Sequence, residues 1–166
     1  MVPHPADVAV EAWADSREGC LAEAMRGMVE SFADIERARP DDSVTFVVTE
    51  ESDEEVLVAV LQEVIYQIEM FGRLAVDMSI DEPTEFPVER VEARLATVPL
   101  ETVERIGAVP KAVVMHNLRF GWVDGIWRAQ AVVDVAIDRD ERTPFGGWDD
   151  EGRKNGPRAR LDQEDA

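Results

Sequence analysis

The segment SDEEVLVAVLQEVIYQIEMFG, residues 52–72, predicts a complete amphipathic helix with both ends marked. Ser52 and Glu55 fit a capping box, in which the two residues satisfy free backbone N–H groups of the first helical turn. Apolar side chains recur every three or four residues and form one stripe to be buried. Gly72 can adopt the left-handed conformation that ends a helix. The remaining elements are placed outward from this helix.

Three elements are expected before this helix. Residues 6–14 alternate between two faces, which is typical of a strand covered on one side. Asp15 or Ser16 can cap a second amphipathic helix over residues 16–33. Residues 43–50 are rich in β-branched side chains and predict another strand.

Four strands are expected after the helix, over residues 74–80, 91–98, 112–123 and 126–137. The last two flank Asp124-Gly125, a dipeptide that accepts the positive φ angles of a tight hairpin turn. The order of elements predicts an α+β fold of two layers, with two helices packed on one face of a mixed β-sheet and a C-terminal β-hairpin. We expect this folded domain to span residues 1–137. The charged segment 138–166 lacks hydrophobic periodicity and is expected to be a disordered tail.

Composition excludes several classes of function. The chain has 36 Asp and Glu against 17 Lys and Arg, a net charge of −19, which disfavours a direct grip on RNA or DNA phosphates. Its one cysteine and two histidines leave little for a transition-metal centre. The sequence contains no phosphate-binding glycine loop and no nucleophile elbow, so a self-sufficient enzyme is disfavoured. Without an apolar leader or a membrane-spanning run, the expected location is the cytoplasm.

Two carboxylates are the main candidates for chemistry. Asp7 lies on the polar side of the first strand, and Asp134 interrupts an otherwise apolar run in the last one. If the two strands were neighbours, the carboxylates would repel each other unless a cation or a shared proton lay between them. Oxygen ligands select a hard ion such as Ca²⁺ or Mg²⁺. The alternative is that each aspartate simply faces water.

Other polar residues have ordinary structural explanations. His116 shares a predicted strand face with apolar side chains, which favours a buried, hydrogen-bonded histidine over a ligand. Lys111 points to the opposite face, as an exposed ion pair or as an anion contact. Glu63 is expected to be solvated on the flank of its helix. His4 could reach the same end of the sheet as Asp7, although terminal residues are usually mobile.

Several fragments together resemble the archease family in order and spacing. They are His4-Pro5-Ala6-Asp7-Val8, Leu61-Gln62-Glu63-Val64-Ile65-Tyr66 followed by Gly72, Lys111-Ala112-Val113 with His116-x-Leu118, and Val132-Val133-Asp134-Val135. The family motifs that they match are H-T-A-D-V, L-N-E-L-L-Y, K-A-V-T-Y-H-x-L and V-x-D-I. The resemblance covers most of the chain.

This resemblance implies a protein cofactor, not an enzyme. Archeases assist the RNA-splicing ligase that joins a 2′,3′-cyclic phosphate or 3′-phosphate end to a 5′-hydroxyl end, as in tRNA splicing. They promote guanylylation of the ligase histidine and support multiple turnover. By resemblance, a divalent metal ion is held by Asp7, Asp134 and the backbone of Val135. The residues implied in partner activation are His4, Glu63, Lys111 and His116. The expected partner is the ligase, without direct RNA binding or a membrane.

The chain departs from the family pattern beside the implied metal site. Pro5 replaces a threonine, Val114 and Met115 stand where the family has Thr-Tyr, and Gln62 replaces an asparagine. Two other functions are therefore considered. One is an acidic, chaperone-like interaction module that binds a basic client without metal. The other is a small hydrolase with Asp7, His116 and Asp134 as its acid and base groups.

Overall fold

In the computed structural model, residues 7–81, 90–136, 159–160 and 163–164 are described. The chain divides into two compact units, residues 1–136 and 137–166. In the second unit, β9 (Ala159–Arg160) and β10 (Gln163–Glu164) pair antiparallel. The predicted disorder of the rest of 138–166 lies outside the described residues.

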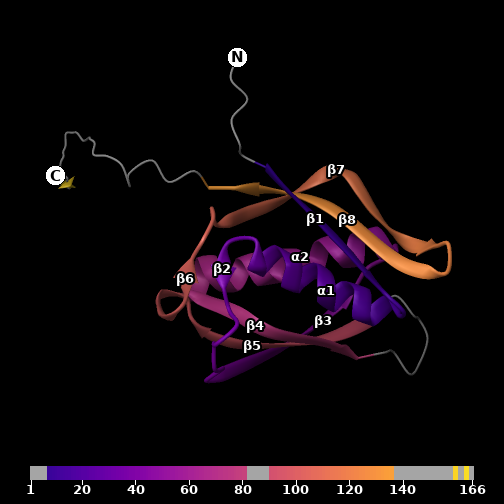
Figure 1. Cartoon of the computed structure of the whole chain (residues 1–166), viewed down its shortest axis with the longest axis horizontal. Coiled ribbons are helices and arrows are strands. Elements are labelled where there is room, and N and C mark those ends of the chain that lie inside the picture. Colours follow the sequence, from indigo (N-terminus) through magenta and orange to yellow (C-terminus); the bar gives the residue numbers. More distant parts are fainter. Residues whose placement is uncertain (1–6, 82–89, 137–158, 161–162, 165–166) are drawn as a thin grey trace, which may run out of the picture. The chain divides into compact units, whose positions relative to one another are not determined.

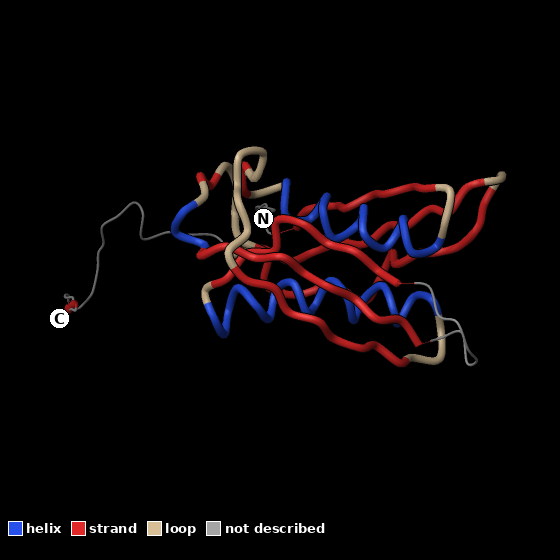
Figure 2. The backbone as a smooth tube through the Cα atoms, turned by 90° about the horizontal axis from the view of Figure 1, so that it is seen from below, coloured by secondary structure: helices blue, strands red, loops and turns tan. Residues whose placement is uncertain are grey.

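The first unit contains two helices between two antiparallel sheets (Figure 1). The helices are α1 (Arg17–Glu30) and α2 (Asp53–Phe71). One sheet has the order β1-β8-β7, formed by β1 (Asp7–Ala14), β8 (Ile126–Val135) and β7 (Pro110–Val123). The other has the order β3-β5-β4, formed by β3 (Asp42–Thr49), β5 (Arg90–Pro99) and β4 (Arg73–Asp81). The strands of this second sheet run across both helices (Figure 2).

The predicted α+β class and the C-terminal hairpin are confirmed, and the arrangement of layers differs from the prediction. Six of the strands form two three-stranded antiparallel sheets where one mixed sheet was expected, and the helices are covered from both sides. The physical reason is that α1 and α2 bury more than a single stripe. The buried side chains cover a wide face of each helix; in α1 they run from Cys20 and Ala24 to Met25 and Val29. Periodicity identifies such helices without showing how many sheets cover them.

Both ends of α2 carry the predicted cap residues, with the Glu55 carboxylate bonded to the Ser52 hydroxyl where a capping box has a bond to the Ser52 N–H. The Ser52 hydroxyl accepts a hydrogen bond from the Glu55 N–H at 3.1 Å and donates one to the Glu55 carboxylate at 3.2 Å. Gly72 closes the helix at a φ of 62°, and its N–H donates to the Ile68 carbonyl oxygen. A residue with a Cβ would be strained there, so glycine lets the chain turn directly into β4.

The first helix is shorter than predicted. Ser16 caps α1 by accepting from the Gly19 N–H at 3.0 Å, as expected. The helix ends at Glu30 instead of residue 33, because the chain turns into β2 (Ala33–Asp34), which pairs with β6 (Glu104–Arg105). A short 3-10 helix, Leu100–Thr102, joins β5 to β6.

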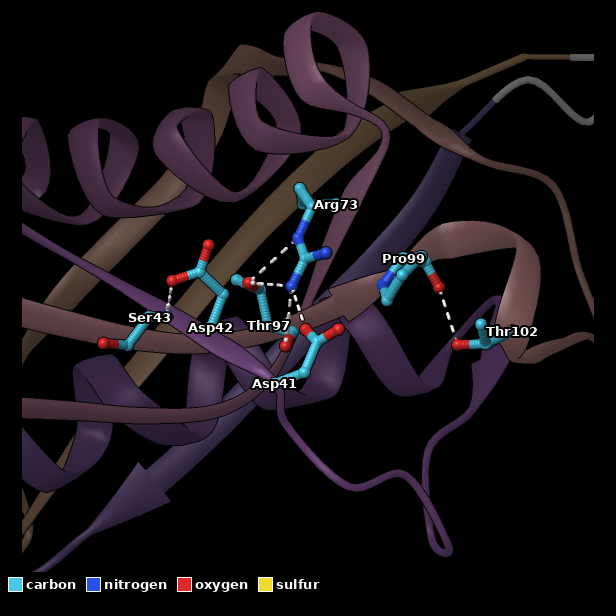
Figure 3. Close-up of polar contacts among 7 residues, drawn as sticks. All are labelled: Asp41, Asp42, Ser43, Arg73, Thr97, Pro99 and Thr102. Atoms are coloured by element: carbon cyan, nitrogen blue, oxygen red, sulfur yellow. Dashed lines mark hydrogen bonds and ion pairs between the residues drawn. The ribbon is translucent and has the colours of Figure 1, made fainter.

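Arg73 ties together the three strands at one end of the β3-β5-β4 sheet (Figure 3). Its Nη2 donates to the Asp41 carboxylate and to the Thr97 carbonyl oxygen, the latter at 3.1 Å. Its Nε donates to the Thr97 hydroxyl at 3.2 Å. Because Thr97 is only 3% exposed, these bonds satisfy polar atoms that water cannot reach. We assign this cluster a structural role.

No helix in the described residues combines the length and apolar character needed to cross a membrane.

Candidate functional site

Asp7 and Asp134 lie directly opposite each other on neighbouring strands. Strand β1 pairs antiparallel with β8, and the register places Asp7 against Asp134. Opposite residues of an antiparallel pair point to the same face, with Cβ atoms roughly 5 Å apart. The sequence could only suggest this neighbourhood, because 126 residues separate the two aspartates.

The carboxylate pair lies on the outer face of the β1-β8-β7 sheet. The inner face, which packs on the helices, carries the buried Val10, Ala12, Ala131 and Val133. By alternation, Asp7 and Asp134 belong to the opposite face; Asp7 is exposed and Asp134 half-buried. Both carboxylates are therefore accessible from solvent.

Val135 offers a backbone oxygen beside this pair. Its side chain is buried, and its partner on β7 is Pro110. Because proline has no backbone N–H, Pro110 cannot donate to the Val135 carbonyl oxygen. Two carboxylates and a carbonyl are all hard oxygen donors, the type that Ca²⁺ and Mg²⁺ select. The donor chemistry thus fits a divalent cation.

Within residues 7–81 and 90–136, no group of three or more His, Cys, Asp or Glu side chains gathers in a way that could hold a metal ion. The described side chains therefore contribute a pair of carboxylates and not a complete cage. Asp7 and Asp134 lie at one level of the sheet, whereas His116 lies in the β7 segment opposite Ala131, three residues away along β8. His4 lies outside the described residues.

His116 is exposed, and its predicted place as a buried histidine is wrong. The four residues 115–118 of β7 stand opposite the single residue Ala131 of β8. Such a bulge breaks the alternation on which the prediction rested, and Asn117 adopts a positive φ of 59° within it. The Gln130 side-chain amide donates to the Asn117 carbonyl oxygen at 3.2 Å and holds the bulge to β8.

Lys111 also occupies a bulge. Pro110 pairs with Val135 and Ala112 pairs with Asp134, so Lys111 has no opposite residue. Its side chain is exposed and adjoins the level of the aspartates, because Ala112 lies opposite Asp134. The bulge makes the face of Lys111 depend on local backbone geometry, whereas the prediction used simple alternation.

Glu63 lies apart from the aspartate pair. Helix α2 packs on the inner side of the sheet, and the Glu63 carboxylate accepts from the Gln67 amide at 3.0 Å. Its neighbour Gln62 accepts from the Val113 N–H at 2.9 Å. Since β7 is an edge strand, this bond satisfies a donor that no strand can pair. The helix thus braces β7 next to Lys111.

A hollow of about 680 Å³ lies elsewhere, beside α1, β2 and β4, and the Arg26–Asp77 ion pair at 3.1 Å stands on its wall. None of the predicted site residues lines it.

Sequence reasoning missed a second, smaller groove on the outer face, near the hairpin turn. It is lined by Trp13, Arg119 and Arg128 among others. Alternation alone could have placed Trp13 outward with Asp7. The register of β1 on β8 was needed to bring the arginines beside it.

Fold and site together define an α+β protein whose two antiparallel sheets enclose two helices, with a paired carboxylate on one outer face. The sequence model of the family described as "Archease protein family (MTH1598/TM1083)" matches residues 1–135. The chain belongs to the archease family.

Named relatives agree with this assignment. The chain is 40% identical over 134 residues to a "Probable protein archease" of Mycobacterium tuberculosis, covering 81% of this chain and 73% of that protein. It is 27% identical over 135 residues to a "Protein archease" of Methanopyrus kandleri, covering 81% and 96%.

Two solved structures share the fold. The solution structure of protein 1598 of Methanobacterium thermoautotrophicum superimposes with a TM-score of 0.64 at 18% identity, covering 81% of this chain and 96% of that one. A crystal structure described as an archease, possible chaperone, from Thermotoga maritima gives a TM-score of 0.55 at 19% identity, covering 81% and 95%.

Proposed function

We propose that this chain is a non-enzymatic protein cofactor that binds a divalent cation and stimulates guanylylation and turnover of a partner RNA ligase. The observation that carries the proposal is the register of Asp7 against Asp134. Like charges directly opposite each other on neighbouring strands destabilise a sheet. A cation bound between them replaces that repulsion with attraction and would stabilise the two carboxylates on the open face.

Asp7, Asp134 and the Val135 carbonyl oxygen would hold the ion. When bound, the ion supplies a concentrated positive charge that can offset phosphate charge at a partner's active site. Lys111, which adjoins the level of the pair, adds a second positive group on the β7 side. His116, exposed in the bulge two residue pairs further along β7, can contact the partner directly.

The charge of the chain supports a protein partner with a basic surface. A net charge of −19 repels RNA phosphates and attracts a protein that carries a positively charged RNA channel. Complementary charge speeds the encounter without providing chemistry of its own. Stimulation should therefore weaken as salt concentration rises.

The test is a guanylylation assay with the cognate ligase, with and without this protein. Asp7→Asn and Asp134→Asn should each reduce stimulation by about tenfold or more, the scale seen when a group supporting a metal site is lost. Asp124→Asn is the matched control, because it removes one negative charge from the hairpin turn at the other end of β8. Asn accepts the positive φ of 54° at that position. Full stimulation by both aspartate variants would reject the assigned role.

Calorimetric titration of the protein alone with Ca²⁺ and with Mg²⁺ tests the cation separately. Saturable binding that disappears in Asp134→Asn supports the site, and the titration also ranks the two ions. Stimulation that persists without binding would favour the metal-free alternative below.

That alternative, an acidic interaction module, has one observation in its favour. Several large apolar side chains are exposed, among them Met115 at 65% and Trp122 at 57%. Exposed apolar groups on a charged surface are typical of protein interaction sites. Under this alternative, Met115→Ser would weaken ligase binding while both aspartate variants stimulate normally.

A further inference from the structure

A groove on the outer face of the β1-β8-β7 sheet lies at the end away from the aspartate pair. It encloses about 250 Å³ near the hairpin turn. The side chains that line it include Glu11, Trp13, Arg119, Val123, Arg128 and Gln130. Trp13 is six residues from Asp7 along β1, so the groove lies about 20 Å from the proposed cation site.

Strand register brings an indole ring and two guanidinium groups together there. Trp13 lies opposite Arg128, and on its other side Arg128 lies opposite Gly121. Because Gly121 has no side chain and its Cα hydrogens face open space, it leaves room beside the arginine. Arg119 follows one step along β7, opposite Gln130.

The aromatic and cationic groups of this groove are not engaged elsewhere among the described residues. The structure pairs Arg17, Arg26 and Arg73 with carboxylates, whereas neither Arg119 nor Arg128 forms an ion pair within residues 7–81 and 90–136. Trp13 is 58% exposed and joins no ring–ring contact in the same part of the chain.

Carboxylates and arginines both lie close to Trp13. Glu11 lines the groove and also a second hollow beside α1, where Glu23 and Glu30 join it. Arg119 and Arg128 line the groove and not the second hollow. In a chain with about twice as many acids as bases, two arginines left free beside an exposed tryptophan form a local site for an anion with a flat ring.

We propose that this groove binds a nucleoside phosphate, with the base stacked on the Trp13 indole and the phosphate held by Arg119 and Arg128. Bases stack on exposed aromatic side chains of a sheet, and guanidinium groups bind phosphate through charged hydrogen bonds. Glu11 lies on β1, next to the strand of Arg128 but two strands and about 10 Å from Arg119, so the phosphate is placed at the β7 side of the groove, between the two arginines.

The ligand chemistry can come from a free nucleotide or from the terminal nucleotide of an RNA strand. The net charge of −19 opposes tracking along many phosphates, but one nucleotide presents only one phosphate group. The proposal does not depend on the cation or on the ligase. Its test therefore uses this protein alone, in a buffer with a chelator, and separates its failure from that of the proposed function.

The experiment is a calorimetric titration with AMP and GMP, with adenosine and inorganic phosphate as half-ligands. We expect saturable binding of at least one nucleotide, with adenosine and phosphate each about tenfold weaker, because each keeps only one of the two contacts. A short single-stranded oligoribonucleotide with a 3′-phosphate identifies the source. Tighter binding than AMP indicates an RNA end, and equal or weaker binding indicates the free nucleotide.

Matched variants separate the groove from general surface effects. Trp13→Leu and Arg128→Gln should each weaken binding about fivefold or more. The controls are Trp122→Leu, at an equally exposed tryptophan turned to the other face of the hairpin, and Arg94→Gln, at an exposed arginine on β5. Both controls should bind like the parent, and thermal unfolding midpoints verify that all four variants are folded.

Three results would overturn the proposal. One is the absence of saturable nucleotide binding up to about 10 mM, since weaker binding than this has no specificity to explain. Another is binding that Trp13→Leu leaves unchanged. The third is an acidic peptide that competes as well as AMP does, which would make the groove a docking site for a protein segment.

Discussion

The two sheets of this protein cover the same pair of helices but differ in regularity. The β3-β5-β4 sheet has a single register shift and is tied at one end by Arg73. The β1-β8-β7 sheet has two shifts, both on β7, and a positive φ at Asn117. Its outer face carries the aspartate pair and the groove. Bulges redirect side chains. Under the proposed function, the irregular sheet presents the candidate site and the regular sheet supports the fold.

The largest expected effect comes from a substitution in the core of the helices, which both sheets cover. Leu61 is fully buried in α2, so Leu61→Ala should lower the free energy of unfolding by about 2–5 kcal/mol. Met70→Ala, at a side chain of the same helix that is 60% exposed, is the control and should change it by less than about 0.5 kcal/mol.

Urea titration followed by two probes also tests whether the sheets are one cooperative unit. Three of the four tryptophans, Trp13, Trp122 and Trp127, lie in the β1-β8-β7 sheet, and Trp148 lies outside the described residues. In a Trp148→Phe background, tryptophan fluorescence follows that sheet while circular dichroism follows the helices and both sheets. Because the helices lie between the sheets, the two transitions should coincide. Separate midpoints would show that the sheets unfold independently.

A smaller effect is expected from Arg73, and it distinguishes a structural role from the role proposed for the aspartate pair. Arg73→Met removes the donors that satisfy the buried Thr97 and should cost about 1–3 kcal/mol. Ligase stimulation at a temperature where the variant is folded should stay at the parent level, in contrast to Asp134→Asn. A loss of stimulation by folded Arg73→Met would mean that the regular sheet takes part in function.

Local signals in the sequence predicted the elements, because caps and turns act within a few residues. Ser52, Gly72 and the Asp124-Gly125 turn each specify a backbone conformation at one place, and the structure has all three. The end of α1 was misjudged because β2 pairs with β6, about seventy residues later. Pairing over that distance is decided by packing and leaves no local pattern.

The candidate site, too, could be predicted only where local sequence patterns sufficed. An unpaired carboxylate in an apolar strand marked Asp134 as unusual, and the register of β1 on β8 then supplied its neighbour. His116 was misplaced because it lies inside the bulge of β7, where three extra residues break the alternation that the prediction assumed. The groove at Trp13 was missed because its arginines come from strands more than a hundred residues away.

The Cys20 thiol allows a test of how α1 packs against β1 of the irregular sheet. Its thiol is fully buried in α1 and donates weakly to the Ala12 carbonyl oxygen of β1 at 3.7 Å. Burial raises the pKa of Cys20 to about 11, and the nearby Glu23 carboxylate adds to the rise. An unfolded thiol ionises near pH 8.5 to 9, so the unfolded state gains charge first and stability falls as pH rises between the two pKa values.

The free energy of unfolding should therefore drop by about 1 kcal/mol more in the parent than in Cys20→Ala between pH 7 and pH 10. Chemical denaturation at several pH values measures the difference. Equal pH dependence of the parent and the alanine variant would show that the thiol is not protected in the fold.

The smallest expected effect is the change in stability of Asp134→Asn relative to the parent, and its sign should reverse when a divalent ion is added. In a chelating buffer, Asp134→Asn should raise the free energy of unfolding by about 0.2–1 kcal/mol, because it removes the repulsion between opposite carboxylates. Millimolar Ca²⁺ or Mg²⁺ should stabilise the parent by binding its folded state and leave the variant unchanged. The order of stability would then reverse on adding the ion. Asp124→Asn, which removes equal charge at the turn, should keep its order relative to the parent in both buffers. A variant that is less stable than the parent without metal would mean that Asp134 is held by a partner other than a cation, and the outer face would lose its proposed centre.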